Sequence, residues 1–210
     1  MKPIDIDRDK FVNALRDTQK YDYWLWPEFF VNDELQNLKQ QVNSLNLEVE
    51  PEEFGAEGKK LTNSFTFEFK DISKLDSMIR LKKYITYINE CHFGYSIYEY
   101  SDFDLVCYNT YDGNLKHEYK WHIDRASNLN VDFKYTVLSN ISDNYTGGEL
   151  LLNSGGDIMQ IDDFKPGAVL MFRSNVQHKV NPVLSGTRKT LSFFVRGPRW
   201  KWFILKIKIL

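Results

Sequence analysis

Short strand signals separated by tight-turn residues dominate the chain from residue 97 onward, and they constrain its fold more than any other feature. Alternation of apolar and polar side chains is typical of strands with one buried face. The strands that we predict are Ile97–Tyr100, Leu105–Tyr108, Tyr119–Asp124, Phe133–Ser139, Glu149–Leu152, Ile158–Ile161, Ala168–Phe172, Gln177–Val183 and Thr187–Val195. The turn pairs between them are Asp112-Gly113, Gly147-Gly148, Gly155-Gly156, Pro166-Gly167 and Ser185-Gly186. This pattern predicts a mainly β fold with packing helices (α+β), namely a double-stranded β-helix, the cupin-like jelly roll.

The segment before residue 97 contributes the packing helices. Helical periodicity predicts one helix over Asn32–Leu45, with Asn32 as its N-cap, and a second from Ser73 to about Gly94. Tyr23–Trp26 is a short extended segment, and the alternating Phe65–Phe69 segment is a strand. The polar stretch Pro51–Lys60 has little to bury and is predicted to be a loop.

The length of 210 residues suits one domain with a sizeable core. We predict a polar N-terminal segment over 1–22, a domain over 23–199 with its jelly-roll core at about 97–196, and an extension over 200–210. In that extension, apolar and basic residues alternate. An edge strand, an interfacial segment or a dimer contact would fit it, and an extra strand packed on the core is favoured.

The composition excludes several classes of partner. A formal net charge of −2 argues against nucleic acid and against a membrane surface. We find no signal-peptide pattern and no apolar run of bilayer length, so a cytoplasmic protein is expected. The two cysteines, Cys91 and Cys107, show no disulfide framework and no metal-ligand spacing. The oligomeric state is left open.

Two histidines and one aspartate form a candidate metal site. His122 and Asp124 are two residues apart on a predicted strand, so their side chains share one face. His178 lies on a later predicted strand. Two imidazoles and one carboxylate on one side of a metal leave coordination positions open, which is the geometry of non-haem Fe(II) oxygenases. Mn or Zn could occupy the same ligands.

Arg188 is predicted to bind a carboxylate in the same cavity. It follows the Ser185-Gly186 turn, and we expect His178 and Arg188 to lie on the two strands of one hairpin, both pointing inward. A guanidinium group binds a carboxylate through two parallel hydrogen bonds. A metal triad together with an inward arginine therefore suggests a co-substrate that chelates iron and carries a distal carboxylate, as 2-oxoglutarate does.

The order of these motifs resembles the 2-oxoglutarate/Fe(II)-dependent dioxygenases of the prolyl 4-hydroxylase-like type. The resemblance covers about Tyr23 to Arg199. The matching stretches are Tyr108 to Asp124, Tyr145 to Leu150, Pro166 to Phe172, His178 to Val183 and Gly186 to Arg188. Several motifs in the same order are specific in a way that a lone His-x-Asp is not.

The resemblance implies a role for each matching position. His122, Asp124 and His178 would bind Fe(II), Arg188 would hold the distal carboxylate of 2-oxoglutarate, and Tyr108 would hydrogen-bond the co-substrate. For Tyr108 a plain buried aromatic is equally compatible. O₂ would be the second co-substrate, with ascorbate as an accessory reductant. Tyr119 and Trp121 share a face with neither histidine and are interpreted as packing, unless a strand bulge brings Tyr119 to the pocket edge.

The reaction implied is hydroxylation of an unactivated C–H bond with release of succinate and CO₂. Asp124 speaks against halogenation, because no ligand position is vacated for halide. The resemblance favours a prolyl or other residue in a peptide or protein, and a free amino acid or small metabolite stays open. The alternative from another class is a non-catalytic jelly-roll module that binds a metal or ligand, or serves a structural role.

Overall fold

We describe a computed structural model of the chain over residues 22–45, 47, 50–53, 60–101, 104–125 and 131–199. The helices are α2 (Asn32–Ser44) and α3 (Asp76–Ile88), with a 3₁₀ turn at Phe69–Asp71 and a π-helical turn at Asn89–Phe93. The strands are β1 (Tyr23–Trp26), β2 (Glu50–Glu53), β3 (Lys60–Glu68), β4 (Leu105–Asp112), β5 (Glu118–His122), β6 (Val131–Asn140), β7 (Tyr145–Gly147), β8 (Leu150–Ser154), β9 (Asp157–Gln160), β10 (Val169–Arg173), β11 (Gln177–Val180) and β12 (Val183–Pro198). The predicted N-terminal segment and C-terminal extension lie outside the described residues, apart from Asp22.

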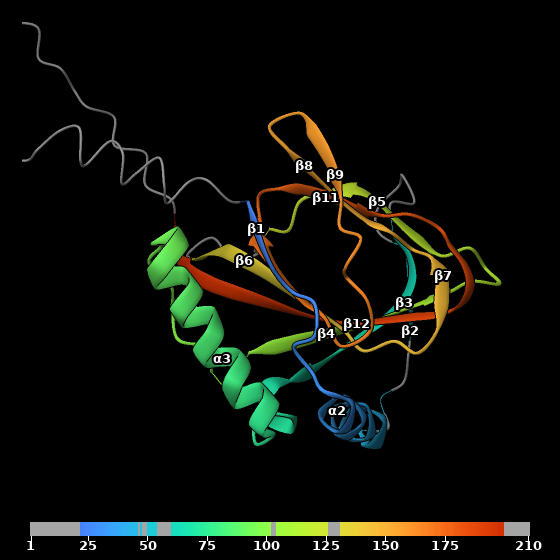
Figure 1. Ribbon diagram of the computed structural model, residues 1–210, viewed down its shortest axis with the longest axis horizontal. Coiled ribbons are helices and arrows are strands. Elements are labelled where there is room, and N and C mark those ends of the chain that lie inside the picture. Colours follow the sequence, from blue (N-terminus) through green and yellow to red (C-terminus); the bar gives the residue numbers. More distant parts are fainter. Residues whose placement is uncertain are drawn as a thin grey trace, which may run out of the picture.

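The strands form one rolled, antiparallel sheet. Its hydrogen-bonded order is β1-β10-β6-β12-β4-β3-β5-β11-β8-β9, with β2 added to β3 and β7 added to β12. In Figure 1, β5, β11, β8 and β9 lie on one side of the roll, and β6, β12 and β4 lie on the other. Strands distant in sequence are thus neighbours, as β12 shows by pairing with both β4 and β6. The predicted double-stranded β-helix is confirmed.

The long strand β12 separates two hydrophobic clusters. Leu191, Phe193 and Val195 face the cluster that also contains the buried sides of α2 and α3. Because successive side chains of a strand point to opposite faces, Arg188 and Thr190 face the interior of the roll. There a second cluster, which includes Leu150 and Phe172, joins the two walls. The helices cover the other face of this part of the sheet and leave the interior face free of helices.

Both helices pack on the outside of the sheet (Figure 1). Their buried residues recur at helical spacing, namely Leu35, Leu38 and Val42 in α2, and Met78, Leu81, Ile85 and Ile88 in α3. The Arg80 guanidinium joins them, since it donates to Glu34 Oε1 at 2.6 Å and to the Phe29 carbonyl at 2.7 Å. Among the described residues, no helix has the length and apolar character required to cross a bilayer.

Three local predictions need correction. The predicted strand Ile97–Tyr100 is irregular, because it joins the end of β12 through the single Tyr98 N–H to Arg196 carbonyl bond (2.7 Å) rather than a ladder. The N-cap of α2 is Val31 rather than Asn32, and its N–H donates to Glu34 Oε2. The predicted loop 51–60 includes β2, because its backbone pairs with β3 despite its acidic sequence. Residues 54–59 of that loop lie outside the described residues.

Helix α3 begins at Asp76, three residues later than predicted from Ser73. Residues 73–75 form a turn and a bend that follow the 3₁₀ turn at Phe69–Asp71. Its C-terminal end agrees with the prediction. The π-helical turn ends at Gly94, whose φ of 67° is a left-handed conformation that glycine adopts without steric cost.

Candidate metal centre

The roll brings the three predicted metal ligands together. His122 ends β5, His178 lies on β11, and the two are direct cross-strand partners. Asp124 completes the group, and one ligand atom from each residue lies within 4.8 Å of the others. His122 Nε2 is 3.7 Å from Asp124 Oδ1, and His178 Nε2 is 3.5 Å from Asp124 Oδ2. Across the described residues, this is the one cluster of three or more histidine, cysteine or acidic groups close enough to hold a metal.

Asp124 is not on a strand, contrary to the prediction. Strand β5 ends at His122, and Asp124 is positioned instead by contacts to two other elements. Its backbone N–H donates to the Ser174 carbonyl at 3.0 Å, in the turn after β10. Its carboxylate accepts a 2.6 Å hydrogen bond at Oδ2 from Thr136 Oγ1, on β6. The expected shared face of His122 and Asp124 is therefore produced by tertiary contacts rather than by strand alternation.

Both histidines are oriented by backbone carbonyl groups. His122 Nδ1 lies 2.8 Å from the Lys120 carbonyl, and His178 Nδ1 lies 3.0 Å from the Val176 carbonyl. A carbonyl oxygen only accepts, so each Nδ1 carries the proton and each Nε2 keeps its lone pair for a metal. These partners could not be identified from the sequence, because every residue has a carbonyl. The donor set, two imidazole nitrogens and one carboxylate, fits Fe(II).

Burial keeps His178 neutral. Loss of hydration lowers the pKa of His178 from 6.5 to about 4, and the bond to the Val176 carbonyl opposes this shift. Between these two values the unfolded chain binds more protons than the folded chain. The free energy of unfolding therefore falls as the pH decreases through this window.

We expect metal-free protein to lose on the order of 3 kcal/mol of stability through His178 as the pH falls across this window. The measurement is urea denaturation at about pH 7 and about pH 4.5, compared with the His178→Gln variant, because other groups also titrate over this range. The wild type should lose more stability than the variant. Equal losses in the two proteins would contradict the burial effect.

Tyr119 reaches the site through a strand bulge. The pairing of β5 with β11 shifts register between His178 and Val180, so that Tyr119 rather than Lys120 opposes Val180. The Tyr119 ring then stacks on the His122 ring, with centroids 3.5 Å apart and 13° between the planes. The strand bulge thus brings Tyr119 to the pocket edge, which was the alternative to its predicted packing role. Trp121 points elsewhere and packs against Lys179, whose Nζ is 5.4 Å from the ring centroid.

Arg188 is buried in the same cavity and forms no ion pair with any carboxylate of the described residues. Only 1% of its surface is exposed, and Nε and Nη2 have no hydrogen-bond partner within the part of the chain that the structure describes. Its guanidinium carbon lies 5.1 Å from the Tyr111 ring centroid and 5.7 Å from that of Phe164. A buried cation with unused donors is costly unless an anion joins it. The arrangement is therefore suited to an anionic ligand.

The predicted hairpin that joins His178 to Arg188 does not form. Strand β11 pairs with β5 and β8, whereas β12 pairs with β4, β6 and β7. The two residues lie on opposite walls of the roll and face each other across its interior. They nevertheless line one cavity of about 500 Å³, together with His122 and Asp124.

Tyr108 is not in this cavity, and its predicted contact with a co-substrate is wrong for this geometry. It lies in the helix-side cluster and packs edge-on against Phe65, with ring centroids 4.8 Å apart. Tyr111, three residues later on β4, faces the interior beside Arg188. Burial raises the pKa of Tyr111, so its phenol stays protonated and can donate a hydrogen bond. Tyr108 and Tyr111 point to opposite faces of β4, because side chains alternate along a strand. The prediction assigned the wrong face of this strand to the cavity.

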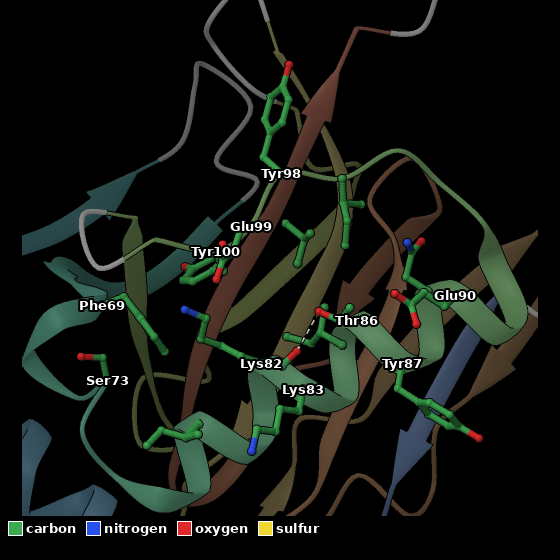
Figure 2. A pocket seen from close by; sticks show the side chains of 15 residues that line it. Phe69, Ser73, Lys82, Lys83, Thr86, Tyr87, Glu90, Tyr98, Glu99 and Tyr100 are labelled. Atoms are coloured by element: carbon green, nitrogen blue, oxygen red, sulfur yellow. Dashed lines mark hydrogen bonds between the residues drawn. The ribbon is translucent and has the colours of Figure 1, made fainter.

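A larger groove of about 910 Å³ lies between α3 and the segment that leads to β4. Figure 2 shows its side chains, with Lys82, Lys83 and Thr86 on the helix opposite Tyr98 and Tyr100. None of the three metal-ligand candidates, nor Arg188, belongs to its lining. Cavity volume alone therefore does not identify the functional site. The smaller interior cavity is the candidate site, because it contains the metal-ligand candidates and Arg188.

Comparison with known proteins points to one family. Residues 105–196 match a family model described as the 2OG-Fe(II) oxygenase superfamily. A PKHD-type hydroxylase of Synechococcus sp. (strain CC9605) is 36% identical over 72 residues, which cover 33% of this chain and 32% of that protein. The matched part thus spans about a third of the length of this curated relative.

Solved structures of prolyl hydroxylases share the fold. A prolyl-4-hydroxylase of Pseudomonas putida superposes with a TM-score of 0.66 at 14% identity, over 89% of this chain and 98% of that chain. A prolyl hydroxylase of Trichoplax adhaerens, solved with a hypoxia inducible factor oxygen degradation domain peptide fragment, gives a TM-score of 0.64 at 16% identity, over 93% of each chain. At these identities the likeness establishes the architecture.

Proposed function

We propose that this chain, whose residues 105–196 match the model of the 2OG-Fe(II) oxygenase superfamily, is a 2-oxoglutarate- and Fe(II)-dependent dioxygenase that hydroxylates an unactivated C–H bond. The observation that carries this proposal is the placement of the His122, Asp124 and His178 triad in one cavity with the buried Arg188, whose Nε and Nη2 have no hydrogen-bond partner among the described residues. A ligand that chelates the metal and carries a distal carboxylate would bind to the triad at one end and to Arg188 at the other.

Each cavity residue has a distinct task in this proposal. The Nε2 atoms of His122 and His178 and the Asp124 carboxylate hold the metal. Arg188 binds the distal carboxylate of 2-oxoglutarate, and the Tyr111 phenol beside it supplies a further donor. The bound metal supplies the oxygen chemistry, in which 2-oxoglutarate, O₂ and a C–H bond give succinate, CO₂ and an alcohol.

We expect Gly148→Ala to weaken 2-oxoglutarate binding without removing the metal. A Cβ at Gly148 would lie 3.0 Å from Arg188 Cδ and 2.9 Å from Val183 Cγ2, so the arginine stem must move. The matched control is Gly155→Ala, because Gly155 has a similar φ of 64° but nothing within 4 Å of the added Cβ. Both substitutions therefore introduce a similar backbone strain, and only Gly148→Ala also displaces Arg188.

The measurement is the Kd for 2-oxoglutarate of the Mn(II)-loaded proteins, followed by calorimetry. Gly148→Ala should raise this Kd, and Gly155→Ala should leave it at the wild-type value. Equal Kd values for the two variants would contradict the proposed contact between Arg188 and the co-substrate.

The proposed substrate is a prolyl residue in a peptide or protein. Support comes from the relatives, since the Pseudomonas putida and Trichoplax adhaerens neighbours are prolyl hydroxylases and the second was solved with a peptide. The interior cavity of about 500 Å³ has room for a side chain beside the co-substrate. A free amino acid would need charged partners for its amino and carboxylate groups inside the same cavity.

The substrate proposal can be tested with paired peptides that differ only in proline or alanine at one position. Mass spectrometry should detect an added oxygen atom in the proline peptides alone, with one succinate formed for each oxygen added. Oxygen added equally to the alanine peptides would exclude prolyl specificity. Metal and 2-oxoglutarate binding without any succinate would instead favour the non-catalytic binding module.

A further inference from the structure

The turn that joins β10 to β11 contacts two of the three metal-ligand candidates. Its Ser174 carbonyl accepts the Asp124 backbone N–H at 3.0 Å, and its Val176 carbonyl accepts the proton on His178 Nδ1 at 3.0 Å. The Ser174 hydroxyl also lies 3.0 Å from Thr136 Oγ1, which is bonded to the Asp124 carboxylate. This turn and the facing residue of β6 therefore surround Asp124 with directed hydrogen bonds.

We propose that Thr136 and Ser174 are positioning residues, which form a hydroxyl relay that orients the Asp124 carboxylate as a metal ligand. The inference deepens the proposed function, because it rests on the same metal centre. It assigns a role to two side chains that are not among the three metal-ligand candidates. Their effect on the metal is transmitted through Asp124 alone.

The chemistry of the groups sets the direction of the relay. An ionised carboxylate only accepts hydrogen bonds, so the single hydroxyl proton of Thr136 points to Asp124 Oδ2. Thr136 Oγ1 can then only accept in its contact with Ser174, whose hydroxyl must be the donor. Each bond polarises the next, and a chain that ends on a charge strengthens in a buried site.

The relay also distinguishes the two oxygens of Asp124. Oδ2 accepts the bond from Thr136 at 2.6 Å and lies 3.5 Å from His178 Nε2, while Oδ1 lies 3.7 Å from His122 Nε2. Holding one oxygen fixes the plane of the carboxylate before a metal arrives. We expect this orientation to increase the affinity for the metal, because metal ligands without fixed partners must be ordered during binding.

Packing alone does not explain two hydroxyl groups at these positions. Thr136 and Ser174 are each 1% exposed, and valine has nearly the shape of threonine without its buried hydroxyl. Two neighbours of Thr136 on this face are apolar, namely its cross-strand partner Phe172 and Leu138. A hydroxyl group here is useful because a carboxylate lies next to it.

The test compares Thr136→Val with Thr136→Ser, Ser174→Ala and the control Thr190→Val. Thr190 is also buried, at 2% exposure, and lies on the neighbouring strand β12, away from the hydrogen bonds around Asp124. Co(II) is the probe, because it is stable in air and reports ligand geometry in its visible spectrum. The Kd for Co(II), the spectrum and the thermal midpoint of the metal-free protein are measured for every variant.

We expect Thr136→Val to raise the Kd for Co(II) by roughly 10- to 100-fold and to alter its visible spectrum. Thr136→Ser should restore both, and Ser174→Ala should raise the Kd by less than Thr136→Val. Thr190→Val should bind Co(II) as the wild type does. The thermal midpoint of the two valine variants should be similar, so that loss of folding is not the cause.

A wild-type Kd in Thr136→Val would overturn the inference, as would an equal increase in Thr190→Val or a wild type that binds no Co(II). The proposed function is tested separately, because Co(II) binding requires neither 2-oxoglutarate nor turnover. Protein that shows the expected series of Co(II) affinities but forms no succinate would retain the relay and lose the oxygenase activity.

Discussion

Asp124→Ala protein is expected to bind no measurable Fe(II) and to form no succinate. Asp124 is the only carboxylate in the three-residue group, and its loss leaves two neutral imidazoles to hold a divalent cation. The Nδ1 bonds to the Lys120 and Val176 carbonyls do not depend on Asp124, so both rings should keep their orientation. The remaining pair lacks both the charge and the third ligand.

The measurement is anaerobic Fe(II) titration of Asp124→Ala alongside Asp157→Ala. Asp157 is an exposed aspartate on β9, outside the interior cavity, and its loss removes the same charge from the protein. The control should bind Fe(II) as the wild type does. Fe(II) retained by Asp124→Ala at wild-type affinity would place the metal elsewhere.

Arg188→Ala should raise the apparent KM for 2-oxoglutarate with little change in the affinity for Fe(II). The guanidinium is buried, and Arg188 is not one of the three metal-ligand candidates. Hydrogen bonds to a charged group contribute about 1.5–3 kcal/mol, so the expected increase is roughly tenfold to a hundredfold. Arg188→Lys keeps the charge but loses the two parallel donors, so its KM should lie between those of the wild type and the alanine variant.

Although loss of the Arg188 guanidinium should weaken 2-oxoglutarate binding, it should stabilise the metal-free protein. Arg188 Nε and Nη2 have no partner among the described residues, so the folded state carries the cost of a buried, incompletely satisfied cation. Arg188→Leu should therefore raise the thermal midpoint of the metal-free protein. An unchanged KM for 2-oxoglutarate in Arg188→Ala would show that the carboxylate role is wrong.

Residue identity and spacing were sufficient to predict much of the fold and the metal-ligand candidates. Turn glycines and strand alternation predicted the jelly roll, and the spacing of His122 and Asp124 identified the candidate group that the structure brings together. The interior position of Arg188 was also predicted, although the hairpin expected to produce it does not form.

The predictions that failed depended on strand phase or on contacts between distant elements. Tyr108 was assigned to the cavity, where the structure has Tyr111, because the face of β4 that meets the helices cannot be identified from a short apolar run. Thr136 and Ser174 lie on elements remote in sequence, and nothing in their local sequence indicates the nearby carboxylate. The carbonyl partners of the histidines have no sequence signal at all.

The central claim is that one cavity holds Fe(II) and 2-oxoglutarate together for reaction with O₂. The most direct measurement is anaerobic addition of Fe(II) and 2-oxoglutarate, recording the weak visible metal-to-ligand charge-transfer band, followed by O₂ and an assay for succinate. We expect the charge-transfer band to decay as succinate is released, even without the true substrate. Folded, iron-loaded protein that shows no band and forms no succinate would contradict it.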